Sequence, residues 1–124
     1  MDARGHPSAT RAVDGTELDL RGGRVLGSTV IDHPFAELDR RDGWATVTLR
    51  DPDSDRAVRL QADASFGWLH VFTADDQGDK AREALAVEPM TCPPDAFNSG
   101  ADLVVLAPGD THRAAYRLSG VGAW

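Results

Sequence analysis

The stretch WATVTLRDPDSDRAVRLQAD, residues 44–63, decides the fold of this sequence. In WATVTLR, alanine or aliphatic side chains alternate with polar ones or tryptophan, and a half-buried β-strand has this period of two. The turn formers DPDSDR follow, and AVRLQAD resumes the alternation with Val58 and Leu60 on one face. The pattern predicts a β-hairpin.

Further strands are predicted on both sides of this hairpin. Upstream, we expect the chain to enter the domain at residues 31–35, and downstream GWLHVFTAD, residues 67–75, predicts a third antiparallel strand in succession. An apolar strand then leads to its end near Glu88, although DKAREALAV alone is equally rich in helix formers. Apolar runs in ADLVVLAPGD and HRAAYRLSGVGAW complete about six strands. Together they predict an all-β fold, an antiparallel β-sandwich or part of one.

Length and composition favour one globular domain. The chain has 124 residues, of which 41% are hydrophobic and 27% charged, and both fractions lie near the averages of soluble proteins. Residues 1–16 are rich in Gly, Ser, Thr, Asp and Pro and show no period. We therefore predict a flexible N-terminal arm over residues 1–16 and a sandwich domain over residues 17–124.

Charge and cysteine content exclude several classes of partner. The formal net charge is −7, so we expect neither nucleic acid nor an anionic membrane surface as a partner. Cys92 is the only cysteine and has no internal disulfide partner. No apolar run approaches the roughly 20 residues that span a bilayer, and the first residues lack the apolar core of a signal peptide. These features predict a reduced, cytoplasmic protein.

Two carboxylates follow short apolar runs and precede prolines. Glu88 stands before Pro89 in AVEPM, and Asp32 stands two residues before Pro34 in VIDHPF. If two strand ends present these carboxylates to one pocket, Asp32 is suited to accept hydrogen bonds from substrate hydroxyls and Glu88 to remove a proton. The alternatives are a solvent-exposed or ion-paired glutamate and a turn-forming aspartate.

The histidines and the cysteine give no metal-binding pattern. The sequence contains His6, His33, His70 and His112 without any close ligand spacing, and Cys92 lacks a companion, so we predict no metal and no cofactor. The alternation in WLHVFT places His70 on the strand face opposite Leu69 and Val71. That face is either a polar pocket or plain surface.

Three aromatic residues lie close to these candidates in the sequence. Trp68, Phe72 and Phe97 are suited to stack against the C–H face of a sugar ring, and they are equally suited to a hydrophobic core. The sequence leaves both interpretations open.

Taken in order, these stretches resemble the C-terminal half of the aldose 1-epimerases, also called galactose mutarotases. The similarity covers roughly residues 13–118 and lies in DGTELDLRGGRVLG, VIDHPF, FGWLHVFTAD and AVEPMTCPPDAFNSGADLVVLAPGDTHRAAYRL. Its most specific element is a Glu-Pro-x-x-x-x-Pro-Asp-Ala-x-Asn turn followed downstream by Leu-x-Pro-Gly.

The resemblance implies a galactose-mutarotase-like β-sandwich that interconverts the α and β anomers of free hexoses such as glucose or galactose, without a cofactor. It implies that Glu88 is the general base on the anomeric hydroxyl and that Asp32 holds sugar hydroxyls. It also implies that His70 contacts the substrate, although related proteins commonly have glutamine at that position.

The family's general-acid histidine belongs to an N-terminal half that these residues do not match, together with another substrate-binding histidine and an arginine. The resemblance therefore implies an incomplete sandwich with exposed apolar faces and edges, which a second copy or another chain would cover. The alternative function is a non-catalytic carbohydrate-binding or interaction module derived from a mutarotase.

Overall fold

The computed structural model describes residues 9–122 and is built almost entirely of β-strands. The strands are β1 (Asp32–Phe35), β2 (Arg40–Arg41), β3 (Trp44–Arg50), β4 (Ala57–Ala62), β5 (Trp68–Phe72), β6 (Ala86–Met90) and β7 (Tyr116–Val121). A 3₁₀ turn, η1 (Gly78–Lys80), and a short helix, α1 (Ala96–Ser99), are the helical elements of the described residues. Half of the predicted arm, residues 1–8, lies outside the described part, and residues 9–16 form no helix or strand.

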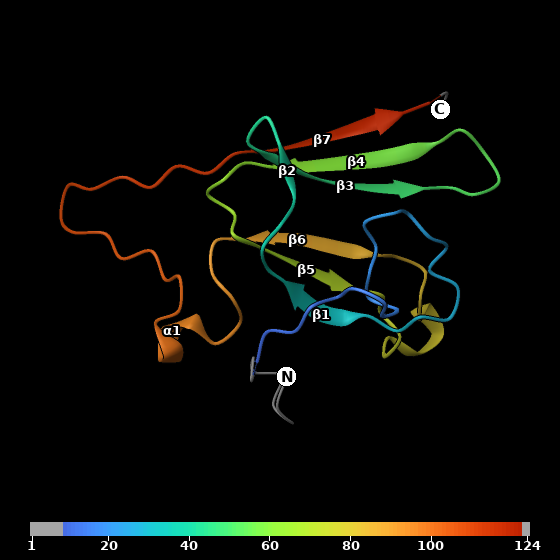
Figure 1. Cartoon of the computed structure of the whole chain (residues 1–124), viewed down its shortest axis with the longest axis horizontal. Helices are drawn as coiled ribbons and strands as arrows, with labels where there is room; N and C mark the ends of the chain where they lie inside the picture. Colours follow the sequence, from blue (N-terminus) through green and yellow to red (C-terminus); the bar gives the residue numbers. More distant parts are fainter. Residues whose placement is uncertain (1–8, 123–124) are drawn as a thin grey trace.

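The strands form two antiparallel sheets, one with the order β1-β5-β6 and one with the order β2-β3-β4-β7. Figure 1 shows the sheets as two separate groups whose strands run in similar directions, as in an aligned sandwich. The prediction of an all-β, sandwich-like fold is confirmed. No helix in the described residues is long and apolar enough to cross a membrane.

The hairpin predicted from residues 44–63 is confirmed as β3 and β4, and the last predicted strand is confirmed as β7. Val47 pairs with Leu60, which pairs with Leu118, so the apolar positions of three strands share one face. Beyond β7, Gly122 has φ 93° and packs on the hairpin turn, where an added Cβ would lie 2.2 Å from the backbone oxygen of Asp55. Only glycine fits there without displacing the turn.

The prediction of three successive antiparallel strands is wrong in one respect, because β5 leaves the hairpin's sheet and pairs with β1 and β6. The chain turns away after β4, where the guanidinium of Arg40 donates hydrogen bonds to the carbonyl oxygens of Ala62, Asp63 and Phe66. These bonds supply donors to carbonyls at and just after the end of β4 and fix the change of sheet.

Two further segments differ from the sequence prediction. The apolar run within residues 102–110 forms no strand, and Val105 is 80% exposed; no neighbouring strand in the described residues pairs with it. Figure 1 shows this connection from α1 to β7 extending beyond the strands. The helix formers before β6 form η1 and turns instead, and β6 continues two residues past Glu88. Glu88 therefore lies in the middle of its strand, not at its end.

The outer strands of the three-stranded sheet each contain a proline. Pro34 lies in β1 and Pro89 in β6, while the central strand β5 contains none. Proline removes a ladder donor, so it is tolerated at a sheet edge and not in a central strand. The two prolines explain why the residues before them have the pattern of a strand end. They also explain why β5, which has no proline, takes the central place.

The core is small and centres on β5. Leu69 and Val71 are 6% and 5% exposed, and Ile31 is fully buried. Thr73 is buried beside Ile31, whose backbone N–H donates to the Thr73 hydroxyl at 2.9 Å. Arg82 donates to the carbonyl oxygens of Gly27 and Thr29, so the segment before β1 is tied to the segment after β5.

Candidate functional site

One face of the three-stranded sheet gathers the three predicted site residues. His70 pairs with Glu88 across β5 and β6, and it pairs with Pro34 of β1, two residues after Asp32. Paired residues and residues two apart on one strand share a face, so Asp32, His70 and Glu88 all lie on the face opposite Leu69 and Val71. The predicted placement of His70 is therefore confirmed.

Asp32 and His70 are in direct contact. Nε2 of His70 lies 2.7 Å from Oδ1 of Asp32, and the two side chains are 17% and 61% exposed. An ionised carboxylate only accepts hydrogen bonds, so Nε2–H of His70 donates to Asp32. The contact holds the imidazole and leaves the second oxygen of Asp32 open to solvent on the same face.

Glu88 lies on the other side of His70 and is exposed. β5 separates β1 from β6, and Asp32 lies two residues along β1 from the position in register with Glu88. Two strand spacings of ~4.8 Å across the sheet and two residues of ~3.4 Å along the strand therefore place the backbones at Asp32 and Glu88 roughly 12 Å apart. Within residues 9–122, Glu88 forms no ion pair and no side-chain hydrogen bond. A carboxylate that is free of cations and open to solvent is available to remove a proton from a bound hydroxyl.

The aromatic candidates separate clearly in the structure. Trp68 and Phe72 are half-buried on β5 and, at two residues on either side of His70, share its face. Nε1–H of Trp68 donates to Oδ2 of Asp102 at 2.8 Å. Phe97 lies on α1 and is 92% exposed, so the alternative that it belongs to the core is wrong.

None of the other described histidines, nor Cys92, is paired with the strand positions of this face. His33 pairs with Val71 and so lies on the opposite face of the sheet, and its Nδ1 accepts the backbone N–H of Asp32 at 3.2 Å. His112 is exposed in the connection before β7, and Cys92 is a half-buried free thiol. His6 lies outside the described residues. In the described part of the chain, no three His, Cys, Asp or Glu side chains are grouped as a metal site would require.

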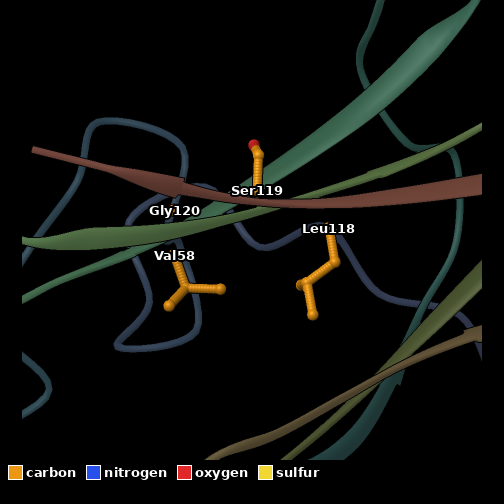
Figure 2. Close-up of a pocket in the computed structure, with 4 residues that line it drawn as sticks. All are labelled: Val58, Leu118, Ser119 and Gly120. Carbon is orange, nitrogen blue, oxygen red and sulfur yellow. The ribbon is translucent and has the colours of Figure 1, made fainter. Parts of the chain in front are cut away.

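Two hollows of the surface lie on the four-stranded sheet. One of about 560 Å³ is lined by Val58, Leu118, Ser119 and Gly120, and Figure 2 shows Val58 and Leu118 pointing to one side of the sheet and Ser119 to the other. A second, of about 380 Å³, lies beside the β3–β4 turn. The first offers only aliphatic side chains and one hydroxyl, which do not transfer protons. The acid–base groups instead lie on a face of the three-stranded sheet that also carries Trp68 and Phe72.

The fold is all-β, and one face of the three-stranded sheet carries the Asp32 carboxylate, the His70 imidazole and the Glu88 carboxylate on three adjacent strands. Residues 5–119 match the model of the aldose 1-epimerase family, and the chain belongs to that family. It is 36% identical over 121 residues to the uncharacterized protein YihR of Escherichia coli (strain K12), a match that covers 97% of this chain and 36% of YihR. The chain thus spans about a third of the length of this curated relative. No solved structure matches the chain.

Sequence reasoning missed the two contacts that organise this face. Both contacts join residues that are far apart in the sequence. The bonded pair His70 and Asp32 is separated by 38 positions, and the pair Trp68 and Asp102 by 34. The alternation of β5 gave the face of His70 and Trp68. Alternation does not encode the partners: the pairing of β1 with β5 brings Asp32 to His70, and the turn after α1 brings Asp102 to Trp68.

Proposed function

We propose that this chain acts on free aldohexoses, interconverting their α and β anomers, with Glu88 as the general base. Membership of the aldose 1-epimerase family supports an isomerase of this class. The observation that carries the proposal is the shared face of Asp32, His70 and Glu88, on which a free carboxylate lies one strand away from a hydrogen-bonded carboxylate–imidazole pair.

In the proposed reaction, Glu88 removes the proton from the hydroxyl on C1. The C1–O5 bond breaks as O5 gains a proton, and an open-chain aldehyde results. Rotation about the C1–C2 bond and closure on the other face of the carbonyl give the other anomer. Every bond and proton is restored within the sugar and its proton donors, so no cofactor is consumed.

Asp32 and His70 supply orientation in this proposal. The oxygen of Asp32 that does not bind His70 accepts a hydrogen bond from a ring hydroxyl. Because His70 donates its Nε2–H to Asp32, the carboxylate is held in one rotamer before the sugar arrives. A misplacement of about 1 Å can cost about 100-fold in rate, so this fixed geometry has a direct catalytic value.

The proton for O5 has no obvious donor among the described side chains of this face. His33 lies on the opposite face and His112 in the long connection. In this chain alone, water is the donor that we propose. A positioned general acid typically contributes about 10²- to 10⁴-fold, so we expect acceleration over buffer that falls short of an enzyme with both groups.

The same observation favours a second candidate, a carbohydrate-binding module without turnover. A face with a hydroxyl anchor and a base but no positioned acid binds sugar by the same contacts. The two candidates differ in one respect, because only the first accelerates the change in optical rotation.

The test is polarimetry of freshly dissolved α-glucose or α-galactose with the wild-type chain, Glu88→Gln and Glu83→Gln. Glu83 is an exposed glutamate of the loop before β6, so it controls for the loss of one charge. We expect wild type and Glu83→Gln to accelerate mutarotation equally and Glu88→Gln to lose about 100-fold or more of the acceleration. Equal rates for wild type and Glu88→Gln would overturn the catalytic proposal.

Tryptophan fluorescence in the same samples distinguishes the second candidate, sugar binding without turnover, from the first. A sugar-dependent change without accelerated mutarotation would assign the chain to sugar binding alone. The absence of both responses would contradict both candidates.

A further inference from the structure

The indole of Trp68 is fixed beside the site by a residue from a distant segment. Trp68 lies two residues before His70 on β5 and pairs with Met90, which lies two residues after Glu88 on β6. Two residues along a strand correspond to about 7 Å, so the indole is the neighbour of both site residues on their own face. It is half-buried, and part of its surface therefore remains open on that face.

Asp102 determines how this indole is oriented. Its Oδ2 accepts Nε1–H of Trp68 at 2.8 Å, and a hydrogen bond to a charged carboxylate is stronger than one between neutral groups. Asp102 itself has φ 50°, a left-handed conformation that few residues other than glycine adopt. Indole has only this one donor, so the bond anchors one edge of the ring and does not involve its faces.

We propose that Trp68 is the platform on which the C–H face of a pyranose ring stacks, and that Asp102 is the positioning residue that holds it. The inference rests on the proposed function and adds a subsite to it. A pyranose carries its hydroxyls around its rim and C–H groups on its faces. The rim then meets His70 and Glu88, the two site residues that neighbour the indole, while one face covers the indole, whose π-surface is apolar and electron-rich.

This arrangement predicts selectivity for the closed ring. An open-chain polyol of the same carbon number has the hydroxyls and lacks a flat C–H face, so it gains the hydrogen bonds without the stacking. Methyl α-glucopyranoside is the matching closed-ring probe, because its blocked C1 prevents ring opening and separates binding from turnover.

The experiment is a titration of the ¹⁵N-labelled chain that follows the indole N–H signals of Trp68 and Trp44. Trp44 is the internal control, since it lies on the other sheet with the guanidinium of Arg117 3.9 Å from its ring centre. We expect methyl α-glucopyranoside to shift the Trp68 signal and leave that of Trp44 in place, and glucitol to shift neither. Equal shifts of both signals, or none, would overturn the proposal.

Variants then distinguish a role of Asp102 in positioning the Trp68 indole from a role in stabilising the connection between α1 and β7. We expect Trp68→Ala to weaken glucoside binding about tenfold and Trp68→Phe to weaken it less, because phenylalanine retains a ring. Asp102→Ala should weaken binding several-fold and raise KM with little change in kcat, and Asp102→Asn should restore most of the loss, since its amide oxygen still accepts the indole N–H.

Asp110→Ala is the matched control, because Oδ2 of Asp110 also accepts a backbone N–H within the same connection, that of Ala107 at 3.0 Å. An effect of Asp110→Ala equal to that of Asp102→Ala would reduce Asp102 to a structural role and contradict the proposal. Failure of the Trp68 platform can be told apart from failure of the proposed function. If the Trp68 signal responds to sugar and Glu88→Gln keeps full mutarotation, only the function fails; if mutarotation depends on Glu88 and Trp68→Ala leaves KM unchanged, only the platform fails.

Discussion

In the three-stranded sheet Leu69 is 6% exposed, whereas in the four-stranded sheet Leu118, at an equivalent apolar position of its face, is 66% exposed. Both leucines alternate with polar neighbours on β-strands, and the local sequence does not distinguish them. The difference lies in what covers each face. The segment before β1 is bonded to the end of β5 through Thr73 and Arg82. On the face of β3, β4 and β7, by contrast, Leu49 and Leu118 stay exposed.

The edges of the two sheets differ in the same way. Pro34 and Pro89 interrupt the donors along both outer strands of the three-stranded sheet. The outer strand β7 contains no proline and has no further partner within the described residues. Unpaired edges and apolar faces favour association with another chain. A second copy or another chain on this side therefore remains our prediction, while each outer strand of the sheet that carries the candidate site is interrupted by a proline.

The largest expected effect on stability comes from truncating the two leucines. Leu69→Ala should destabilise the chain by about 2–5 kcal/mol, because it leaves a cavity in the core. Leu118→Ala should cost less than about 1 kcal/mol, since most of that side chain is already in water. Urea unfolding of both variants measures the two values. Equal losses would mean that the face of the four-stranded sheet is covered in solution, and the comparison would fail.

A smaller effect on the free energy of unfolding is expected from pH, through Asp75 just after β5. The hydroxyl of Thr73, and then the guanidinium of Arg82, hold the pKa of Asp75 below its ordinary range. A carboxyl whose pKa is lower in the folded than in the unfolded state stabilises the fold above the unfolded pKa of about 3.9, and this stability is lost as pH falls through the folded pKa.

Asp75→Asn should therefore unfold less steeply with acid than wild type between about pH 5 and pH 2. Thermal unfolding at a series of pH values gives the slope. Identical slopes for the two proteins would show that the contacts of Asp75 do not contribute to the link between the two segments.

Alternation predicted most of the strands, because it depends only on neighbours in sequence. It gave β3, β4 and β7 and placed His70 opposite Leu69. It failed where stability depends on distant partners: the apolar residues before Pro108 form no strand, and β5 joins the other sheet. A proline after an apolar run predicts a strand end, whereas Pro34 and Pro89 lie inside edge strands, and the sequence alone does not say whether a strand is an edge.

The candidate site shows the same division. The resemblance to the aldose 1-epimerases singled out Asp32, His70 and Glu88, and alternation could place each one only on its own strand. Their common face required the pairing of β1, β5 and β6. Asp102 could not be proposed from sequence at all, since its role is a single contact with an indole 34 positions away.

The measurement that tests the account most directly is a map of backbone amide shifts in the ¹⁵N-labelled chain on addition of glucose or galactose at tens of millimolar. The account predicts shifts at and beside Asp32, His70 and Glu88 on the three-stranded sheet, and none around Val58 and Leu118. Shifts confined to the four-stranded sheet, or none anywhere, would contradict it.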